Sequence, residues 1–265
     1  MLTCDAILNH LPGHPWGALL RIEDEVDSTN TQLKAAARAG APAGSVLIAR
    51  HQTGGRGRLG RQFLSPEGAG LYFSALLRPQ ASPNDLMHLT CAVAVAVCRA
   101  IREACGLEAG IKWTNDIVFG RRKLGGILTE LGLDAQGQAE FAVVGIGLNC
   151  TQSEQDFDPA IREMAGSLQM ATGRAVDQNK LAAALIRQLE RLNRQLWTHR
   201  EELLAEYRQN CVTLGQKVKV CQGQEVRVGT ALDIDRQGGL LVDFCGTIET
   251  VTTGEVSVRG MYGYL

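Results

Sequence analysis

Apolar and polar positions along the chain change their period several times, and these changes divide it into consecutive blocks of strands and helices. Alternating or continuous apolar runs predict strands over residues 19–26, 45–51, 71–77, 111–113, 117–119, 123–131 and 139–148. An alanine-rich helix is predicted over residues 31–39, where Thr29 and Gln32 have the spacing of a capping box. An almost wholly apolar helix is predicted over residues 84–105, and we expect it to be buried.

The pattern changes again in the second part of the chain. A second helical block begins at Asp177, a residue type suited to an N-cap, and continues as an amphipathic pattern to about Tyr207. After Asn210, short alternating segments between glycine turns predict a small barrel of about five strands. These segments are residues 217–221, 225–233, 240–244, 247–251 and 255–258. Because strands occur in blocks and not in regular β-α-β alternation, the predicted class is α+β, with domains over residues 1–211 and 212–265.

The composition narrows the possible functions. With 45% hydrophobic and 21% charged residues among 265, the chain can bury a substantial core. The formal net charge of −1 argues against a protein that coats nucleic acid or an anionic membrane through bulk charge, so any anion site must be local. The eight cysteines form no C-x-x-C pair, and we expect reduced core residues. Because we find neither a signal-peptide pattern nor an apolar run near the ~20 residues of a membrane span, we expect a cytoplasmic protein with no membrane partner.

A loop over residues 52–61 is the most unusual stretch of the sequence, with four glycines, three arginines and no acidic residue. Three of the glycines fit G-x-G-x-x-G. However, Pro66 and Gly68 follow closely and no helical pattern intervenes, which argues against a dinucleotide-binding turn. The composition instead suits a mobile loop whose backbone N–H groups and arginines bind phosphate. A solvated basic loop is the alternative.

Two further clusters suit an anionic ligand. Residues 112–116 combine Lys, Trp, Asn and Asp at a strand end, which suits a nucleotide, although on their own they favour an ordinary turn beside a core tryptophan. In residues 121–130 a basic triplet precedes a glycine pair, so a ligand could lie against bare backbone beside an ammonium group. A solvated turn before a close-packed strand is equally compatible. Residues 145–149 repeat the small-residue pattern, so the two strands would border a groove.

Taken in order, these motifs resemble those of biotin protein ligases, and the resemblance covers essentially the whole chain, including the small barrel. The ordered set is specific, whereas each motif alone is not. The motifs are Asp27-Ser28-Thr29-Asn30, Gly55-Arg56-Gly57-Arg58-Leu59-Gly60-Arg61, Lys112-Trp113-Thr114-Asn115-Asp116, Lys123-Leu124-Gly125-Gly126-Ile127-Leu128-Thr129-Glu130 and Gly145-Ile146-Gly147-Leu148-Asn149. The chain departs from frequent family residues at Thr53-Gly54, Leu59 and Thr114.

The resemblance implies a mixed-sheet catalytic domain of the biotin/lipoate ligase, class II synthetase-like type, followed by an SH3-like barrel. It implies a ligase that uses ATP and Mg²⁺ to convert biotin into biotinyl-5'-AMP. The biotin would then pass to a lysine of the biotin carboxyl carrier protein of acetyl-CoA carboxylase. It also implies a homodimer through sheet edges. Because only 26 residues precede Asp27, too few for a helix-turn-helix module, we expect no operator DNA or other nucleic acid as a partner.

The resemblance also assigns roles to individual residues. Those expected to bind biotin are Ser28, Thr29, Gln52, Gly55, Arg56, Lys123 and Gly125. Those expected to bind ATP are Arg58, Arg61, Lys112, Trp113, Asn115 and Asn149. Lys123, Arg58 and Asp116 are the expected catalytic residues, and Asp116 is also the expected metal ligand.

Two other functions stay open from the sequence. A lipoate ligase would share the catalytic fold and the acyl-adenylate chemistry, although the Gly-Arg loop and the C-terminal barrel favour biotin. An RNA-binding module could use the same loop and the barrel as its surface. The overall charge and the lack of an exposed aromatic cluster count against it.

Overall fold

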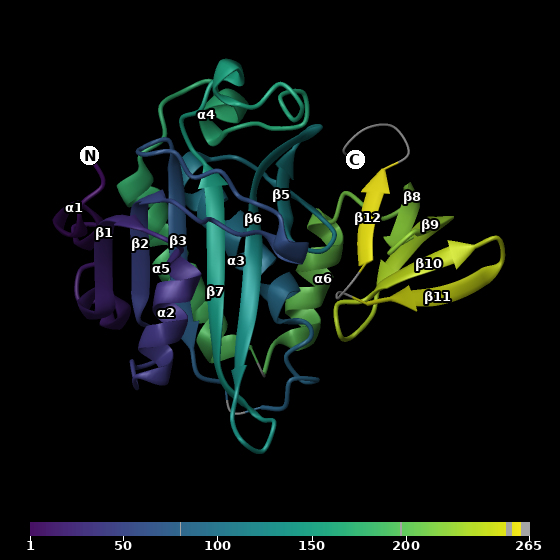
Figure 1. Cartoon of the computed structure of the whole chain (residues 1–265), viewed down its shortest axis with the longest axis horizontal. Coiled ribbons are helices and arrows are strands. Elements are labelled where there is room, and N and C mark those ends of the chain that lie inside the picture. Colours follow the sequence, from purple (N-terminus) through teal and green to yellow (C-terminus); the bar gives the residue numbers. More distant parts are fainter. Residues whose placement is uncertain (80, 197, 253–255, 261–265) are drawn as a thin grey trace.

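The computed structural model describes residues 1–265 except 80, 197, 253–255 and 261–265. It contains a large mixed sheet with a smaller sheet beside it (Figure 1). The large sheet has the order β1-β2-β3-β7-β6-β5-β4, and only its β1–β2 pair is parallel. Its strands are β1 (Leu20–Val26), β2 (Val46–Gln52), β3 (Gly70–Leu77), β4 (Gly110–Lys112), β5 (Asp116–Phe119), β6 (Arg122–Leu133) and β7 (Ala139–Asn149).

Helices cover both faces of the large sheet (Figure 1). They are α1 (Cys4–Leu8), α2 (Thr29–Arg38), α3 (Leu89–Cys105), α4 (Leu168–Thr172), α5 (Gln178–Gln195) and α6 (Arg200–Asn210). Successive side chains of β2 point to opposite faces of the sheet and so pack into two different cores. Leu47 packs with Leu33 of α2 on one face, whereas Val46 and Ile48 belong to the larger core on the other face. That larger core includes the buried faces of α3 and α5. The sheet therefore separates the α2 face from the core that contains α3 and α5.

The predicted α+β class and the strands of the large sheet are confirmed, but three local predictions were wrong. Helix α3 begins at Leu89, because residues 84–88 form turns in which Ser82 and Asp85 hydrogen-bond each other. The second helical block is two helices, α5 and α6. The capping box does not form: Ser28 is the N-cap, and Gln32 Nε2 donates to Asp27 at 2.8 Å.

The C-terminal part forms a five-stranded antiparallel sheet in the order β11-β10-β9-β8-β12. Its strands are β8 (Lys217–Gln222), β9 (Glu225–Ile234), β10 (Leu240–Phe244), β11 (Thr247–Val251) and β12 (Val256–Gly260). Residue 255 of the predicted last strand lies outside the described residues. The small sheet shares one apolar cluster with the part of the chain that holds the large sheet, and it contributes Val218, Ala231 and Ile234 to that cluster. The predicted boundary at residues 211 and 212 stays a prediction.

Within the described part of the chain, helices long and apolar enough to cross a bilayer do not occur.

Candidate active site

Three glycines lie close together on two neighbouring strands, on the α2 face of the sheet. Gly126 of β6 lies opposite Gly147 of β7, and Gly145 follows on the same face. A Cβ on Gly147 would lie 2.6 Å from the Phe63 ring, and one on Gly145 would lie 2.3 Å from Asn30 Oδ1. We call the three glycines the glycine trough. Glycine is therefore required at Gly145 and Gly147 because Asn30 and Phe63 pack directly on the backbone there. Gly126 is the glycine of the trough that lies beside the partly exposed Lys123–Asp116 pair.

One end of the trough carries a buried network of neutral polar groups. The Thr29 N–H donates to Gln52 Oε1 at 2.9 Å, and Gln52 Nε2 donates to Ser65 Oγ at 3.0 Å. The Ser74 hydroxyl lies 2.7 Å from Thr29 Oγ1 and 2.6 Å from Asn30 Oδ1. Because Ser74 is fully buried, the network is held from beneath by β3. Fixed neutral donors and acceptors of this kind suit an uncharged polar ring.

The other end of the trough carries charge. Lys123 Nζ lies 2.5 Å from Asp116 Oδ1, and a Cβ on Gly126 would lie 3.5 Å from each of these atoms. Lys123 has 34% of its side chain exposed and Asp116 has 19%, so the ion pair is only partly buried. The trough therefore joins a neutral polar end to a cationic end.

Backbone contacts fix the position of Lys123. Its N–H donates to Met164 O at 2.7 Å and its carbonyl accepts from Gly166 N–H at 2.9 Å. The buried Asn149 binds the same segment, because its Nδ2 donates to Gly166 O at 2.9 Å. Lys123 is predicted to bind biotin and Asn149 to bind ATP. Both residues are thus held by the same segment, residues 164–166.

The Gly-Arg loop lies over the trough and is tied to it by its arginines. Arg58 Nη1 donates to Asn115 Oδ1 at 3.2 Å, and Asn115 Nδ2 donates to Ile127 O on β6 at 2.8 Å. Arg56 Nη2 donates to Thr31 Oγ1 of α2 at 2.6 Å. Burial lowers the pKa of Arg58, and the nearby Asp116 carboxylate opposes that change. The loop thus brings two guanidinium groups to the charged side of the site.

A cavity of about 420 Å³ lies between this loop, the start of α3 and residues 127–130 of β6. Three polar atoms in its lining residues are buried without a hydrogen-bond partner among the described residues: Arg58 Nη2, Thr114 Oγ1 and Thr129 Oγ1. Native proteins rarely leave such atoms unsatisfied, so the cavity is suited to a polar ligand or to bound water. Glu130 also lines the cavity.

Other predicted site residues lie apart from the open face. The Trp113 indole is 4% exposed and donates from Nε1 to Gly238 O at 2.9 Å, so it packs under the C-terminal domain. Lys112 is also buried, and Arg61 is exposed. A Cβ on Gly125 would lie 2.2 Å from Gly147 O, so Gly125 faces β7 while Gly126 faces the trough.

The remaining predicted residues lie close to the trough. Ser28 is buried at the start of α2, and Gly55 is buried in the loop, where a Cβ would lie 2.4 Å from Phe63 O. Several residues of the site were not among those predicted: Asn30, Phe63, Ser74, Thr90, Gly126, Thr129, Glu130, Gly145 and Gly147. The glycine-pair signal in residues 121–130 and 145–149 pointed to the right strands, but nothing in the sequence marked Ser74.

The residues present fit Mg²⁺ only in company with a substrate. Groups of three or more His, Cys, Asp or Glu that could hold a metal ion do not occur in the described residues. Mg²⁺ is often bound by one or two carboxylates together with substrate phosphates and water, and Asp116 at the charged end could supply one carboxylate.

Comparison with known proteins identifies the family. Residues 24–149 match the Biotin/lipoate A/B protein ligase family, and residues 213–259 match the Biotin protein ligase C terminal domain, which is SH3-like. The biotin–[acetyl-CoA-carboxylase] ligase of Mycobacterium tuberculosis is 37% identical over 244 residues, covering 89% of this chain and 88% of that protein. The bifunctional ligase/repressor BirA of Escherichia coli is 33% identical over 264 residues, covering 98% and 78%.

Comparison with a solved structure points to the same family. The biotin protein ligase from Aquifex aeolicus in complex with biotin and ATP is 30% identical, covers 91% of this chain and 98% of its own, and superposes with a TM-score of 0.78. The chain belongs to the biotin protein ligase family. Members of this family are enzymes that form an amide bond.

Proposed function

We propose that this chain is a biotin–[biotin carboxyl-carrier protein] ligase that activates biotin with ATP and transfers it to a carrier lysine. The observation that carries the proposal is the glycine trough, with a neutral hydrogen-bonding network at one end and the Lys123–Asp116 pair at the other. Biotin has the same asymmetry, because a flat uncharged ring system is joined by an aliphatic chain to a carboxylate. The ring would lie near Thr29 and Gln52, and the carboxylate would reach Lys123.

In the first step, an oxygen of the biotin carboxylate bonds to the α-phosphorus of ATP. The bond from that phosphorus to the bridging oxygen breaks, and diphosphate leaves. Two anions must approach each other, so the main requirement is fixed positive charge at the α-phosphate. Lys123 and Arg58 supply it from β6 and from the Gly-Arg loop. Mg²⁺ held by Asp116 and the phosphate oxygens would neutralise further charge on ATP.

In the second step, the neutral ε-amine of the acceptor lysine bonds to the carbonyl carbon of biotinyl-5'-AMP. The bond from that carbon to the phosphate oxygen breaks, AMP leaves and the amine loses its proton. Until then the mixed anhydride must be kept from water. The Gly-Arg loop over the cavity is suited to this role, because Arg56 and Arg58 fasten it to α2 and to Asn115.

The acceptor is proposed to be the biotin carboxyl carrier protein of acetyl-CoA carboxylase, since the name of the Mycobacterium tuberculosis relative gives acetyl-CoA carboxylase as the acceptor. Homodimerisation, the lack of operator binding and a cytoplasmic location stay predictions from the sequence. Sedimentation with biotin and ATP tests the first of these, and a gel shift against a biotin-gene promoter tests the second.

Exchange of labelled diphosphate into ATP tests the activation step. We expect exchange with biotin and none with lipoate or without an acid. Biotin should then appear on a carrier domain, and it should be absent from the same domain with its acceptor lysine replaced by arginine. Exchange with lipoate alone would assign the other branch of the family, and exchange with neither acid would overturn the proposal.

A further inference from the structure

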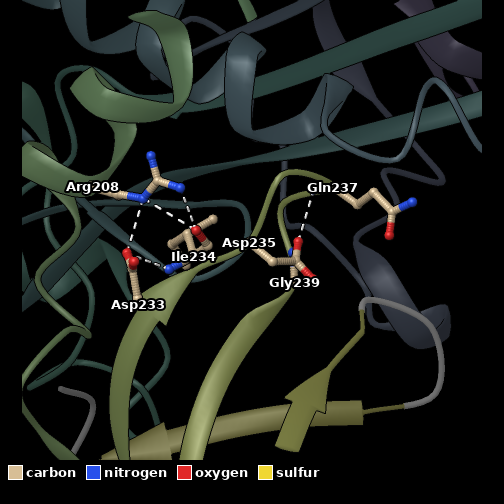
Figure 2. Close-up of polar contacts among 6 residues, drawn as sticks. All are labelled: Arg208, Asp233, Ile234, Asp235, Gln237 and Gly239. Carbon is tan, nitrogen blue, oxygen red and sulfur yellow. Dashed lines mark hydrogen bonds and ion pairs between the residues drawn. The ribbon is translucent and has the colours of Figure 1, made fainter. Parts of the chain in front are cut away.

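The turn between β9 and β10 of the C-terminal domain reaches the catalytic domain in a well-defined conformation (Figure 2). Asp235 Oδ1 accepts the N–H groups of Gln237 and Gly239, each at 2.8 Å. The Gly238 N–H donates to Asp235 O at 3.1 Å, and the Asp235 N–H donates to Gly239 O at 2.9 Å. One carboxylate therefore holds the turn closed.

Helix α6 anchors the base of this turn. Arg208 Nε donates to Asp233 Oδ1 at 2.9 Å, and Arg208 Nη2 donates to Ile234 O at 2.5 Å (Figure 2). The Ile234 N–H also donates to Asp233 Oδ1 at 2.7 Å. Because Arg208 lies near the C-terminal end of α6, the turn is fixed relative to the last helix of the catalytic part.

Gly238 makes the contact at the tip of the turn. Its carbonyl accepts the indole N–H of Trp113 at 2.9 Å, and Cys91 Sγ lies 3.9 Å from the same oxygen. Gly238 is buried with φ +83°, and an added Cβ would lie 2.8 Å from Cys91 Sγ and 3.5 Å from His88 Cα. Both the backbone conformation and the packing against the start of α3 therefore require glycine here.

Two more contacts hold the segment that contains Trp113, one from Thr213 and one from Tyr207 of α6. The Trp113 N–H donates to Thr213 Oγ1 at 2.9 Å, and the Tyr207 hydroxyl donates to Thr114 O at 3.0 Å. All the groups in these contacts are buried. The next two residues, Asn115 and Asp116, belong to the active site, and β6 also holds them, because the Ile127 N–H donates to Asn115 O at 2.9 Å and Asp116 pairs with Gly126.

We propose that Gly238 is a positioning residue of the ligase, and this rests on the proposed function. Its carbonyl holds Trp113, and together with β6 this contact sets the position of the segment that carries Asn115, which holds Arg58, and Asp116, which pairs with Lys123. The neutral end of the trough is built from other elements, α2, β2 and β3. A shift of the turn should therefore affect ATP use and adenylate formation, while biotin binding is retained.

Gly238→Ala tests this in the full-length protein, with Gly223→Ala as matched control. Gly223 lies in the β8–β9 turn with φ +58°, and a Cβ there meets nothing within 4 Å, so the control carries a similar backbone penalty without the collision. We expect Gly238→Ala to lower the single-turnover rate of biotinyl-5'-AMP formation on the order of 10- to 100-fold and to raise the KM for ATP. The biotin Kd should stay within about twofold, and Gly223→Ala should match the wild type.

Two further variants separate positioning from folding. Adding Cys91→Ala to Gly238→Ala removes the colliding sulfur and should restore most of the lost rate. Asp235→Ala opens the turn without adding atoms and should also lower the rate, whereas Asp235→Asn keeps the Oδ1 acceptor and should be nearly wild type. Asp235→Ala decides the question if Gly238→Ala does not fold.

Each possible result supports or overturns the positioning role of Gly238. Wild-type rates per folded molecule in Gly238→Ala or Asp235→Ala, with only the Tm lowered, would overturn the positioning role and leave the ligase function intact. A wild-type protein that makes no adenylate from biotin and ATP would overturn both. Equal losses in biotin affinity and in rate would mean general disruption and would also count against the inference.

Discussion

Replacing Lys123 with alanine should slow formation of the biotinyl adenylate much more than it weakens biotin binding. Lys123 Nζ lies 2.5 Å from Asp116 Oδ1, and the two side chains are 34% and 19% exposed. Without the ammonium group, the Asp116 carboxylate would face the biotin carboxylate and the α-phosphate with one cation fewer. The loss of electrostatic stabilisation is largest where negative charge develops during the reaction, which is at the α-phosphate.

The magnitude follows from this partial burial. Removing a preorganised donor from a developing anion typically costs about 2.7 to 4 kcal/mol, which is roughly a 100- to 1,000-fold loss in rate. Coulomb's law supports this scale, because two unit charges about 4 Å apart interact by about 4 kcal/mol at an effective dielectric constant of about 20. The ground-state ion pair with the biotin carboxylate is more open to water and contributes about 0.2 to 1 kcal/mol, or at most about fivefold in Kd.

Single-turnover formation of labelled biotinyl-5'-AMP at saturating biotin and ATP measures the rate, and calorimetry measures the biotin Kd. Lys123→Arg should recover part of the rate because it restores the charge. Lys217→Ala, on an exposed position of β8, is the control for removal of a lysine elsewhere. A rate for Lys123→Ala within a few-fold of wild type would refute the assignment, and so would a Kd that rises as much as the rate falls.

Arg58→Gly should release the adenylate, since it removes the loop's contact with Asn115, and biotin should then appear on a bystander protein in a blot; labelling confined to the carrier would exclude the lid role. Ser74→Ala should raise the biotin Kd about tenfold and cost about 1 to 3 kcal/mol in stability, because buried partners lose their hydrogen bonds. A rate deficit at saturating biotin would contradict that placement. For Glu130, burial raises the pKa, but hydrogen bonds from Lys34 and Asn30 outweigh it and hold the pKa below its ordinary value. The carboxylate therefore stabilises the fold above the unfolded-state pKa, and the effect disappears as pH falls through the lower folded-state pKa. Urea unfolding of Glu130→Gln should show destabilisation at pH 7 that shrinks once the pH falls below the ordinary glutamate pKa and vanishes below the depressed folded-state pKa of Glu130, and a difference that persists in strong acid would refute it.

The strands of the large sheet could be predicted because each carries its own signal. Apolar residues in β3 and β7 form continuous runs, as expected of strands buried on both faces. Glycine pairs inside a strand are unusual enough to indicate close approach of a ligand or another backbone, and this pointed to the trough. The start of α3 and the break between α5 and α6 could not be predicted in this way. Each is set by a turn, and the apolar pattern continues through that turn without a change.

Ser74 shows the limit of local patterns within the site. It is a single serine in a buried strand, and the sequence shows it only as one polar residue within an apolar run. Its role depends on the register that sets Ser74 beside Gly145 and on the end of α2 that brings Thr29 and Asn30 over it. Register follows from the pairing of whole strands, so no window of sequence around Ser74 contains the information.

Trp113 shows a different limit. Its neighbours in sequence suggest a stacking surface for a nucleotide, yet its indole N–H is used by a carbonyl 125 residues further along the chain. The turn chemistry of residues 235–239 can be read from an Asp followed by two glycines, but the place where that turn docks cannot, because it is set by α6 and by the start of α3. The residues of the loop, the trough and the charged pair are each marked by local sequence. Their relative placement is encoded by contacts made across the two domains, and for this reason the C-terminal domain belongs to the description of the active site even where it contributes no ligand-binding side chain.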